Sequence, residues 1–212
     1  LLVSTHEDIL KIMRSTKKMI SFHSEDEDLL NQRKQYIKRG KPLSHKDWRN
    51  VDTALASTRK LINSANRTKK NIHVLHITTE EEVKLLRKNR KYVSFEVTPQ
   101  HLTLSAPSCY NKLGTFAQMN PPIREKKHLN YLRKTLKAGK IDIIGSDHAP
   151  HLKINKDKSY PESPSGMPGV QTIVPIMLNH MNEGKIRLNQ IINFLCENPV
   201  KIFGIKNKGY IK

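Results

Sequence analysis

Residues 145–151 read Gly-Ser-Asp-His-Ala-Pro-His, and they directly follow the mainly apolar run 141–144. A short apolar run that ends at a glycine is typical of a buried strand, whose alternate side chains point to opposite faces. Asp147 at the end of this strand can therefore face a site, while Pro150 turns the chain and presents His151. The alternative is a capped turn, in which the Asp147 carboxylate accepts backbone N–H groups and the histidines are solvated.

The chain has 212 residues, of which 36% are hydrophobic, so residues 1–212 are expected to form one globular domain or a large part of one. No apolar stretch approaches the roughly 18 residues that span a membrane, and the opening Leu1–Ser4 is too short for a signal peptide. We therefore expect no membrane association and a cytoplasmic location. Cys109 and Cys196 lack Cys-x-x-Cys spacing, which favours inert thiols over a disulfide or a zinc cluster.

The chain is strongly basic, with 38 Lys and Arg against 19 Asp and Glu, a formal charge of +19. Such a charge attracts nucleic acid through nonspecific electrostatics. The basic residues form short scattered runs, such as Lys69-Lys70 and Lys126-Lys127, without the interleaved aromatic residues of a single-strand platform. We therefore expect solvated basic faces and no specific nucleic-acid site. An anionic small-molecule substrate would also suit the sign of the charge.

Short β-like runs alternate with helical patterns, which indicates an α/β fold with a parallel sheet. The expected strands are 19–23, 72–77, 92–97 and 141–146. The expected helices are one that begins near Thr5 with Leu10 and Met13 on one face, one that runs through Trp48, Val51, Leu55 and Ile62, one with a capping box at Thr79 and Glu82, one over 127–137 that stops at Ala138-Gly139, and two after a loop at 159–169, around 170–181 and 188–196.

Polar side chains occupy the ends of all four expected strands. His23 closes the first strand, His76 lies near the end of the second, Glu96 is late in the third and Asp147 follows the fourth. Parallel strands bring their carboxyl ends to one edge of the sheet. Two imidazoles and a carboxylate at that edge form a nitrogen and oxygen ligand set suited to zinc or a similar divalent ion. Two further histidines are expected to be hydrogen-bonded core residues: His73 and His101.

Six motifs, taken together and in order, resemble the dihydroorotase branch of the amidohydrolase superfamily. They are FHSED at 22–26, HVLHITT at 73–79, EVTPQHL at 96–102, MNPPIR at 119–124, GSDHAPH at 145–151 and SPSGMPG at 163–169. The likeness extends from about residue 1 to Lys212. The resemblance implies a zinc-dependent (β/α)8 barrel of the TIM type that interconverts dihydroorotate and N-carbamoyl-aspartate in pyrimidine biosynthesis.

The resemblance also implies a role for each residue at the strand ends. His23 and His76 would be metal ligands, and Asp147 would be a metal ligand that also acts as general acid and base. This assignment is chemically coherent, because zinc lowers the pKa of a bound water and polarises a carbonyl, while a carboxylate can pass a proton to a departing amide nitrogen.

Four more residues resemble the family's substrate contacts: Asn120, His151, Pro164 and Gly166. The amide of Asn120 can donate to and accept from an imide-like edge, and His151 can donate to a substrate carboxylate. The loop at Pro164 and Gly166 would offer backbone groups to the ring, since glycine permits close approach. The alternatives are a turn formed by Asn-Pro-Pro and a flexible loop.

The chain departs from the family in several places. It lacks the early His-x-His pair and the arginine that follows it, and the bridging Lys or Asp of the fourth strand would fall before residue 1. The match therefore covers only the fifth to eighth strand-helix units, a partial barrel, with a stub at 208–212 where the family continues into an accessory β-domain. Gln100 stands where many relatives have histidine, and we expect it to support the ligands rather than join them. The loop after His151 lacks an expected acidic pair.

A partial barrel has open edges at its first and last strands and lacks the layer opposite its inward side chains. We therefore expect pairing with a second copy or with a complementary half-chain. Three interpretations remain open: the C-terminal half of a dihydroorotase that works with another chain, an inactive remnant of a disrupted gene, and a noncatalytic binding module that uses the barrel rim or the basic surface. An upstream reading frame that encodes the missing ligands would favour the first over the second.

Overall fold

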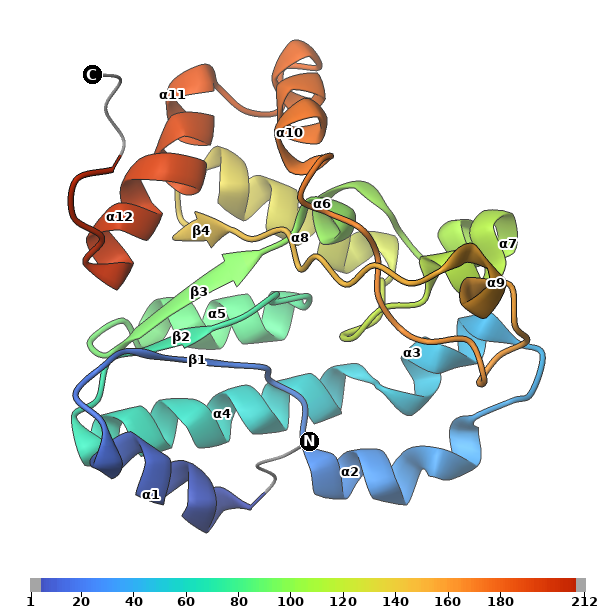
Figure 1. The fold of residues 1–212 in the computed structure, drawn as a ribbon, viewed down its shortest axis with the longest axis horizontal. Helices are drawn as coiled ribbons and strands as arrows, with labels where there is room; N and C mark the ends of the chain where they lie inside the picture. Colours follow the sequence, from blue (N-terminus) through green and yellow to red (C-terminus); the bar gives the residue numbers. More distant parts are fainter. Residues whose placement is uncertain (1–4, 209–212) are drawn as a thin grey trace.

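A computed structural model describes residues 5–208 and contains a four-stranded parallel sheet (Figure 1). Its strands are β1 (Ile20–Phe22), β2 (Ile72–Val74), β3 (Val93–Val97) and β4 (Ile143–Ile144). The strands lie side by side in chain order, β1-β2-β3-β4, and all pairs are parallel. The expected α/β fold with a parallel sheet is confirmed. The opening residues 1–4, and all but the first residue of the expected stub at 208–212, lie outside the described residues.

Each strand occupies the expected segment, but three of the four are much shorter than predicted. The predicted strand 141–146 contributes only Ile143–Ile144 to the ladder. His76 and Asp147 have positive φ angles of 37° and 43°, which a β-strand does not allow. The chain therefore leaves the sheet just before these residues. The β2–β3 pairing of Val74 with Phe95 keeps the strand ends in register, so they meet at one edge.

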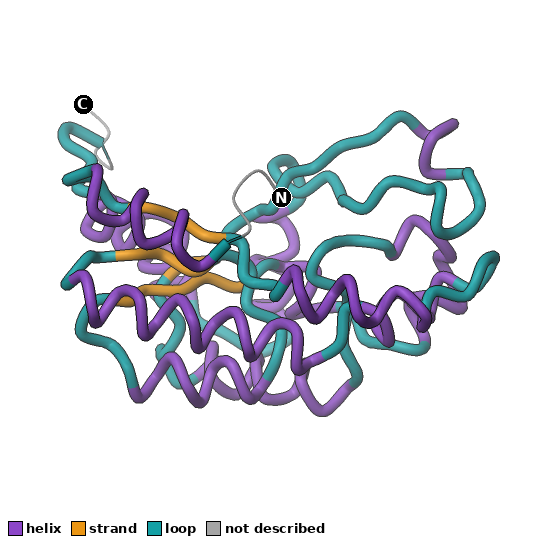
Figure 2. The backbone as a smooth tube through the Cα atoms, turned by 90° about the horizontal axis from the view of Figure 1, so that it is seen from below, coloured by secondary structure: helices purple, strands orange, loops and turns teal. Residues whose placement is uncertain are grey.

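Helices connect the strands and form a layer along one face of the sheet (Figure 2). The α-helices are α1 (His6–Ser15), α2 (Glu27–Gln32), α3 (His45–Trp48), α4 (Val51–Thr68), α5 (Glu80–Lys88), α6 (Pro99–Thr103), α7 (Ser108–Leu113), α8 (Lys126–Lys137), α9 (Lys153–Lys156), α10 (Ile173–Asn182), α11 (Leu188–Ile192) and α12 (Asn198–Phe203). Short 3₁₀ segments are η1 (Arg33–Tyr36), η2 (Pro42–Ser44) and η3 (Gly114–Ala117), and η4 (Asn193–Glu197) is a π-helix.

The main core lies between this helical layer and the sheet. Along β3, Val93, Phe95 and Val97 are buried, whereas Ser94 and Glu96 are only partly buried on the other face. This period of two is typical of a strand whose two faces have different surroundings. The core side of β3 belongs to one apolar cluster with residues of α1, α4, α5 and α8. The opposite face therefore carries the polar chemistry of the sheet.

The single helix expected through Trp48, Val51 and Ile62 is wrong, because the chain breaks between α3 and α4. Arg49 and Asn50 lie outside both helices, and the Asn50 side chain caps α4 by accepting from the Thr53 N–H at 3.1 Å. Of the residues that carried the apolar spacing, Ile62 is buried, whereas Trp48, Val51 and Leu55 are only partly buried. The pattern therefore predicted a helix with Ile62 in the core, but it missed both the interruption and most of the buried face of α4.

The helices after the loop also differ from expectation. The first, α10, begins at Ile173 rather than near residue 170. The second continues from α11 through the π-helix η4 into α12, which was not predicted. Within residues 5–208, none of the helices combines the length and the apolar character needed to cross a membrane.

Local signals elsewhere are confirmed. Thr5 caps α1 by accepting from the Asp8 N–H, and Thr79 with Glu82 forms a reciprocal capping box at α5. The thiols Cys109 and Cys196 are both free. Burial raises the pKa of Cys109 to about 11, which keeps that thiol protonated and inert.

The capping box at α5 predicts a measurable loss of stability when its hydroxyl is removed. Thr79 Oγ1 accepts from the Glu82 N–H at 3.1 Å and donates to the Glu82 carboxylate at 2.8 Å. We expect Thr79→Ala to lower the free energy of unfolding by about 1–2 kcal/mol in urea titrations followed by circular dichroism. Thr79→Ser keeps the hydroxyl and is the control. Equal stability of the two variants would contradict the assignment.

Candidate active site

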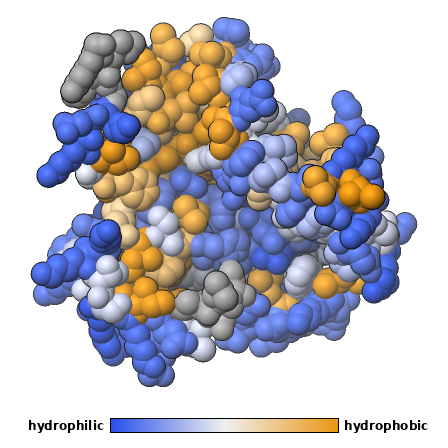
Figure 3. Space-filling model, viewed as in Figure 1, coloured by the Kyte–Doolittle hydropathy of each residue, from blue (hydrophilic) through white to orange (hydrophobic). Residues whose placement is uncertain are grey.

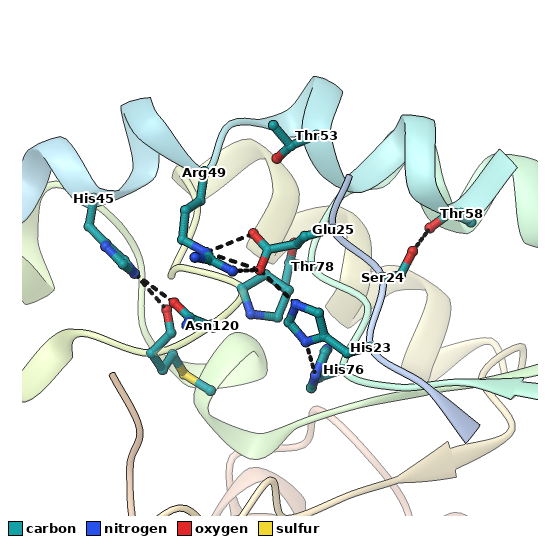
Figure 4. Close-up of polar contacts among 12 residues, drawn as sticks. His23, Ser24, Glu25, His45, Arg49, Thr53, Thr58, His76, Thr78 and Asn120 are labelled. Carbon is teal, nitrogen blue, oxygen red and sulfur yellow. Dashed lines mark hydrogen bonds and ion pairs between the residues drawn. The ribbon is translucent and has the colours of Figure 1, made fainter. Parts of the chain in front are cut away.

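The residues predicted at the strand ends lie at one edge of the sheet. His23 directly follows β1, His76 comes two residues after β2, and Asp147 comes three residues after β4. The two imidazoles are in contact: His23 Nδ1 and His76 Nε2 are 3.0 Å apart (Figure 4). The structure thus brings together two of the three predicted ligands by direct contact and places the third at the same edge.

The surroundings of His76 keep its ring neutral. Burial, and then the charges of His23 and His101, lower the pKa of His76 to about 3. A neutral imidazole is the form that binds metal, because one ring nitrogen then keeps its lone pair. His76 is therefore in the neutral form that a metal ligand requires.

The surroundings of Asp147 raise its pKa, whereas those of His76 lower the pKa of that ring. Burial raises the pKa of Asp147, the nearby carboxylate of Glu96 raises it further, and His23 acts in the other direction. In the turn around Asp147 the backbone N–H groups of Gly169 and Val170 donate to His148 Nδ1, at 3.0 and 3.3 Å. The turn is therefore closed by the His148 ring, and the Asp147 carboxylate does not serve as its cap.

The donor chemistry of these residues fits a divalent ion, but the cluster is incomplete. Within residues 5–208 no three side chains of His, Cys, Asp or Glu come together as a metal-binding group. The expected convergence of His23, His76 and Asp147 is thus seen only for the imidazole pair. Two nitrogens bound to one tetrahedral zinc ion lie about 3.3 Å apart, close to the spacing of this pair. The metal role of the three residues stays a prediction.

A buried carboxylate, which sequence analysis missed as a functional group, orients His23. Glu25 is 3% exposed, and its Oε2 lies 2.9 Å from His23 Nε2 and 3.0 Å from Arg49 Nε. A carboxylate only accepts hydrogen bonds, so Nε2 of His23 carries the proton and Nδ1 offers its lone pair toward His76. Burial opposes ionisation of Glu25, but Arg49 and His23 outweigh it and hold its pKa well below the usual range.

Glu25 and Arg49 differ in how far the sequence alone indicates them. Glu25 was visible, since it lies two residues after His23 in the motif at 22–26. Arg49 gave no signal, because it stands inside a pattern that reads as continuous helix. Its partner is 24 residues away in the chain. Only the tertiary structure reveals this ion pair.

Asn120 is held by a buried histidine that sequence analysis also missed. His45 Nε2 lies 2.9 Å from Asn120 Oδ1 and 3.2 Å from the Met119 carbonyl (Figure 4). Burial, and then the charge of Arg49, lower the pKa of His45 to about 4, so the ring is neutral and donates from Nε2. The same chain segment ends at Arg124, whose guanidinium donates to the Arg49 carbonyl. The segment with the Asn-Pro-Pro turn is therefore hydrogen-bonded to Arg49, which in turn binds the Glu25 carboxylate that contacts His23.

The loop that carries Pro164 and Gly166 is bonded into the fold. His151 Nε2 lies 3.0 Å from the Ser165 carbonyl, and the Gly166 N–H donates to the Gln118 carbonyl at 2.9 Å. Gly166 has a φ of 145°, and a Cβ there would lie 2.6 Å from the Ala149 carbonyl oxygen. Only glycine fits this position. The backbone here has a defined conformation, unlike that of a flexible loop.

His73 and His101 are hydrogen-bonded core residues as expected, and Gln100 lies beside the turn that carries Asp147. His73 and His101 are buried and hydrogen-bonded, His73 to Ser94 at 2.8 Å and His101 to Thr98 at 2.8 Å. Gln100 Nε2 donates to the carbonyl of residue 146, next to Asp147, at 3.2 Å. Gln100 thus supports the turn that carries Asp147.

The buried ion pair predicts a large effect of one substitution. Arg49→Met leaves the Glu25 carboxylate buried without its cation, so we expect a loss of about 3–5 kcal/mol in the free energy of unfolding at neutral pH. Because the folded pKa of Glu25 is lowered, its stabilisation is present above its unfolded pKa and is lost as the pH falls. The difference from wild type should therefore shrink in acid.

Arg39→Met is the matched control, since Arg39 pairs with Glu162 at the surface with 81% of its side chain exposed. We expect this control to cost less than about 1 kcal/mol. A loss at Arg49 no larger than that at Arg39 in urea titrations would contradict the role given to the pair.

Comparison with solved structures supports the fold. L-hydantoinase from Arthrobacter aurescens superposes with a TM-score of 0.91 at 24% identity, over 96% of this chain and 48% of that chain. Dihydroorotase from Saccharomyces cerevisiae, in complex with 5-fluoroorotic acid, superposes with a TM-score of 0.66 at 21% identity, over 74% of this chain and 45% of that one. These likenesses concern the fold.

Comparison of sequences shows the family. Dihydroorotase from Methanosphaera stadtmanae is 30% identical over 97% of this chain and 49% of its own length, and dihydroorotase from Methanosarcina acetivorans is 32% identical over 97% and 46%. The chain thus spans about half the length of the curated relatives that it matches. The model of the amidohydrolase family matches residues 4–212. With six dihydroorotase-like motifs placed around one sheet edge, the chain belongs to the amidohydrolase family.

Proposed function

We propose that this chain forms part of a zinc-dependent cyclic amide hydrolase that interconverts dihydroorotate and N-carbamoyl-aspartate in pyrimidine biosynthesis. The observation that carries the proposal is the contact of His23 with His76 at the sheet edge that also bears Asp147. The names of the relatives support the choice of substrate. The strongly positive charge of the chain suits a dianionic substrate.

In this proposal His23, His76 and Asp147 hold the metal. A bound zinc ion would lower the pKa of a water toward 7 and polarise the ring carbonyl. Glu25 keeps the proton of His23 on Nε2, so that Nδ1 is free to bind. Asp147 would take the proton that the attacking water gives up and deliver it to the departing amide nitrogen, a role that suits a carboxylate whose pKa is raised by burial and by Glu96.

The remaining residues bind and orient the substrate. His45 holds the Asn120 carbonyl, which leaves the amide N–H groups of Asn120 to donate to the substrate ring. His151 is exposed beside the loop, and with Nε2 donating to the Ser165 carbonyl its imidazolium form would donate from Nδ1 to a substrate carboxylate, while the backbone at Pro164 and Gly166 offers further groups to the ring. Together these contacts would fix the ring against the metal-binding edge.

Catalysis in this proposal needs residues from outside the 212 positions. The sequence contains no His-x-His pair, and the sheet ends at β1 and β4 within the described part of the chain. Consecutive neighbouring strands with helices on one face are the arrangement of successive units in a β/α barrel. We propose a partial barrel whose missing ligands come from a complementary half.

The role of Asp147 is testable by a conservative change. We expect Asp147→Asn to abolish dihydroorotate turnover by the chain assembled with its complementary half, because an amide cannot carry the proton or bind the metal as an anion. Asp157→Asn, at an exposed position, is the control and should retain turnover. The 212-residue chain alone should hydrolyse dihydroorotate negligibly. Robust, chelator-sensitive turnover by the pure chain would refute the need for a complementary half.

A second prediction concerns association through an apolar patch beside β4. The patch comprises the exposed residues Val170, Val174, Leu178, Leu188 and Ile192, and apolar atoms gather over α10 and α11 in Figure 3. It continues into a hollow lined by Ile144 of the edge strand. Burying such surface contributes roughly 25 cal/mol per Å² and favours dimers, larger assemblies or pairing with the complementary half.

Sedimentation across a range of protein concentrations tests this association. The wild type should form dimers or larger species, and Val174→Lys should shift them toward monomer, since a buried lysine without a partner is costly. Ile154→Lys changes an exposed apolar side chain on α9 away from the patch and should leave association unchanged. A compact wild-type monomer at all concentrations would disprove the proposal.

A further inference from the structure

One lysine ammonium is buried against backbone carbonyls. Lys156 ends the short helix α9 and is 5% exposed, while Lys153 and Lys158 nearby are exposed. Its Nζ donates to the Gln118 carbonyl at 3.1 Å and to the Pro164 carbonyl at 2.9 Å. Burial lowers the pKa of Lys156 to about 8. Burial of a cation is costly unless it is hydrogen-bonded, so these two carbonyls are what hold it inside.

The two carbonyls belong to the two segments that carry the proposed substrate contacts. Gln118 lies two residues before Asn120, and Pro164 lies two residues before Gly166. Lys156 therefore joins the Asn120 segment to the Gly166 loop through one charged group. Hydrogen bonds from an ionised donor are about twice as strong as neutral ones.

Gln118 reinforces the same junction. Its carbonyl also accepts from the Gly166 N–H at 2.9 Å, and its side-chain amide donates to the Ser163 carbonyl at 2.9 Å and to Ser165 Oγ at 3.0 Å. The ammonium of Lys156 thus polarises the carbonyl that holds Gly166 in place. Loss of the ammonium would weaken several contacts of the loop at once.

The position of Lys156 itself is fixed by contacts to its backbone. Its carbonyl accepts from Thr115 Oγ1 at 2.6 Å and from Ser163 Oγ at 3.1 Å. Thr115 belongs to the 3₁₀ segment η3, which directly follows α7. The lysine is therefore anchored at both ends, at its backbone and at its ammonium, as expected for a side chain that sets a distance between two segments.

We propose that Lys156 is a positioning residue that sets the substrate loop at Pro164 and Gly166 relative to Asn120. This inference rests on the proposed function for its catalytic consequence. Lys156 acts on substrate binding and lies outside the proton path of Asp147. Removing it should therefore raise KM while kcat changes little, the pattern of lost uniform binding.

The structural part of the proposal is tested without catalysis. We expect Lys156→Met to increase hydrogen exchange at the Gly166 amide and its loop neighbours about tenfold or more, since two hydrogen bonds of the brace are lost. Exchange in α4, far from the loop, should not change. Lys153→Met makes the same chemical change on the same helix and should match the wild type throughout.

Two further variants keep the test decisive. If Lys156→Met does not fold, Lys156→Gln keeps an N–H donor without the charge, and its loop exchange should lie above that of the wild type. Lys156→Arg keeps the charge and should restore part of the protection. Wild-type exchange at Gly166 in a folded Lys156→Met or Lys156→Gln protein would overturn the brace, whatever the enzyme does.

The catalytic part uses the chain assembled with its complementary half. We expect Lys156→Met to raise KM for dihydroorotate about tenfold with kcat within about threefold of wild type. An unchanged KM in a variant with faster loop exchange would overturn the positioning role. Absence of turnover in the wild-type assembly would instead refute the proposed function, and the exchange data would still decide whether Lys156 braces the loop.

Discussion

The carboxylate of Glu25, buried between Arg49 and His23, constrains much of the rest of the structure. A carboxylate removed from water requires a cation close by, and Arg49 supplies it with 10% of its side chain exposed. Arg49 stands where the chain leaves the helical path between α3 and α4. The Arg49 carbonyl in turn accepts from Arg124, which links the segment that carries Asn120 to the same pair. The position of the His23 ring therefore depends on contacts from three separate parts of the chain.

Local patterns predicted the elements but not their lengths or interruptions. The capping box at Thr79 was visible because its two partners are three residues apart and satisfy each other. The second strand was predicted too long because Leu75 and Ile77 continue its apolar run after the ladder ends at Val74, close to the positive φ angle of His76. The apolar spacing likewise gave no sign of the helix break at Arg49, because a hydropathy pattern contains no information on which backbone groups are hydrogen-bonded.

The candidate site likewise contains residues that could be predicted from the sequence and residues that could not. His23, His76 and Asp147 were predictable from their place at strand ends, because parallel strands deliver their ends to one edge. Their supporting partners were not. His45 meets Asn120 across 75 residues, and Lys156 meets the Gln118 carbonyl across 38 residues. Such contacts are set by tertiary packing, and neither the residue type nor its neighbours in the chain signals them.

Two buried cations thus organise the two ends of the site. Arg49 holds the His23 end of the candidate site through Glu25, and Lys156 joins the two backbone segments that carry the proposed substrate contacts. Arg124, at the end of the segment that begins near Gln118, connects them through the Arg49 carbonyl. Each cation is costly to bury and useful only where its acceptors are held, so the supports stabilise the fold and orient the site at once. A substitution at Arg49 is therefore expected to alter the surroundings of His23, and a substitution at Lys156 the loop at Pro164 and Gly166.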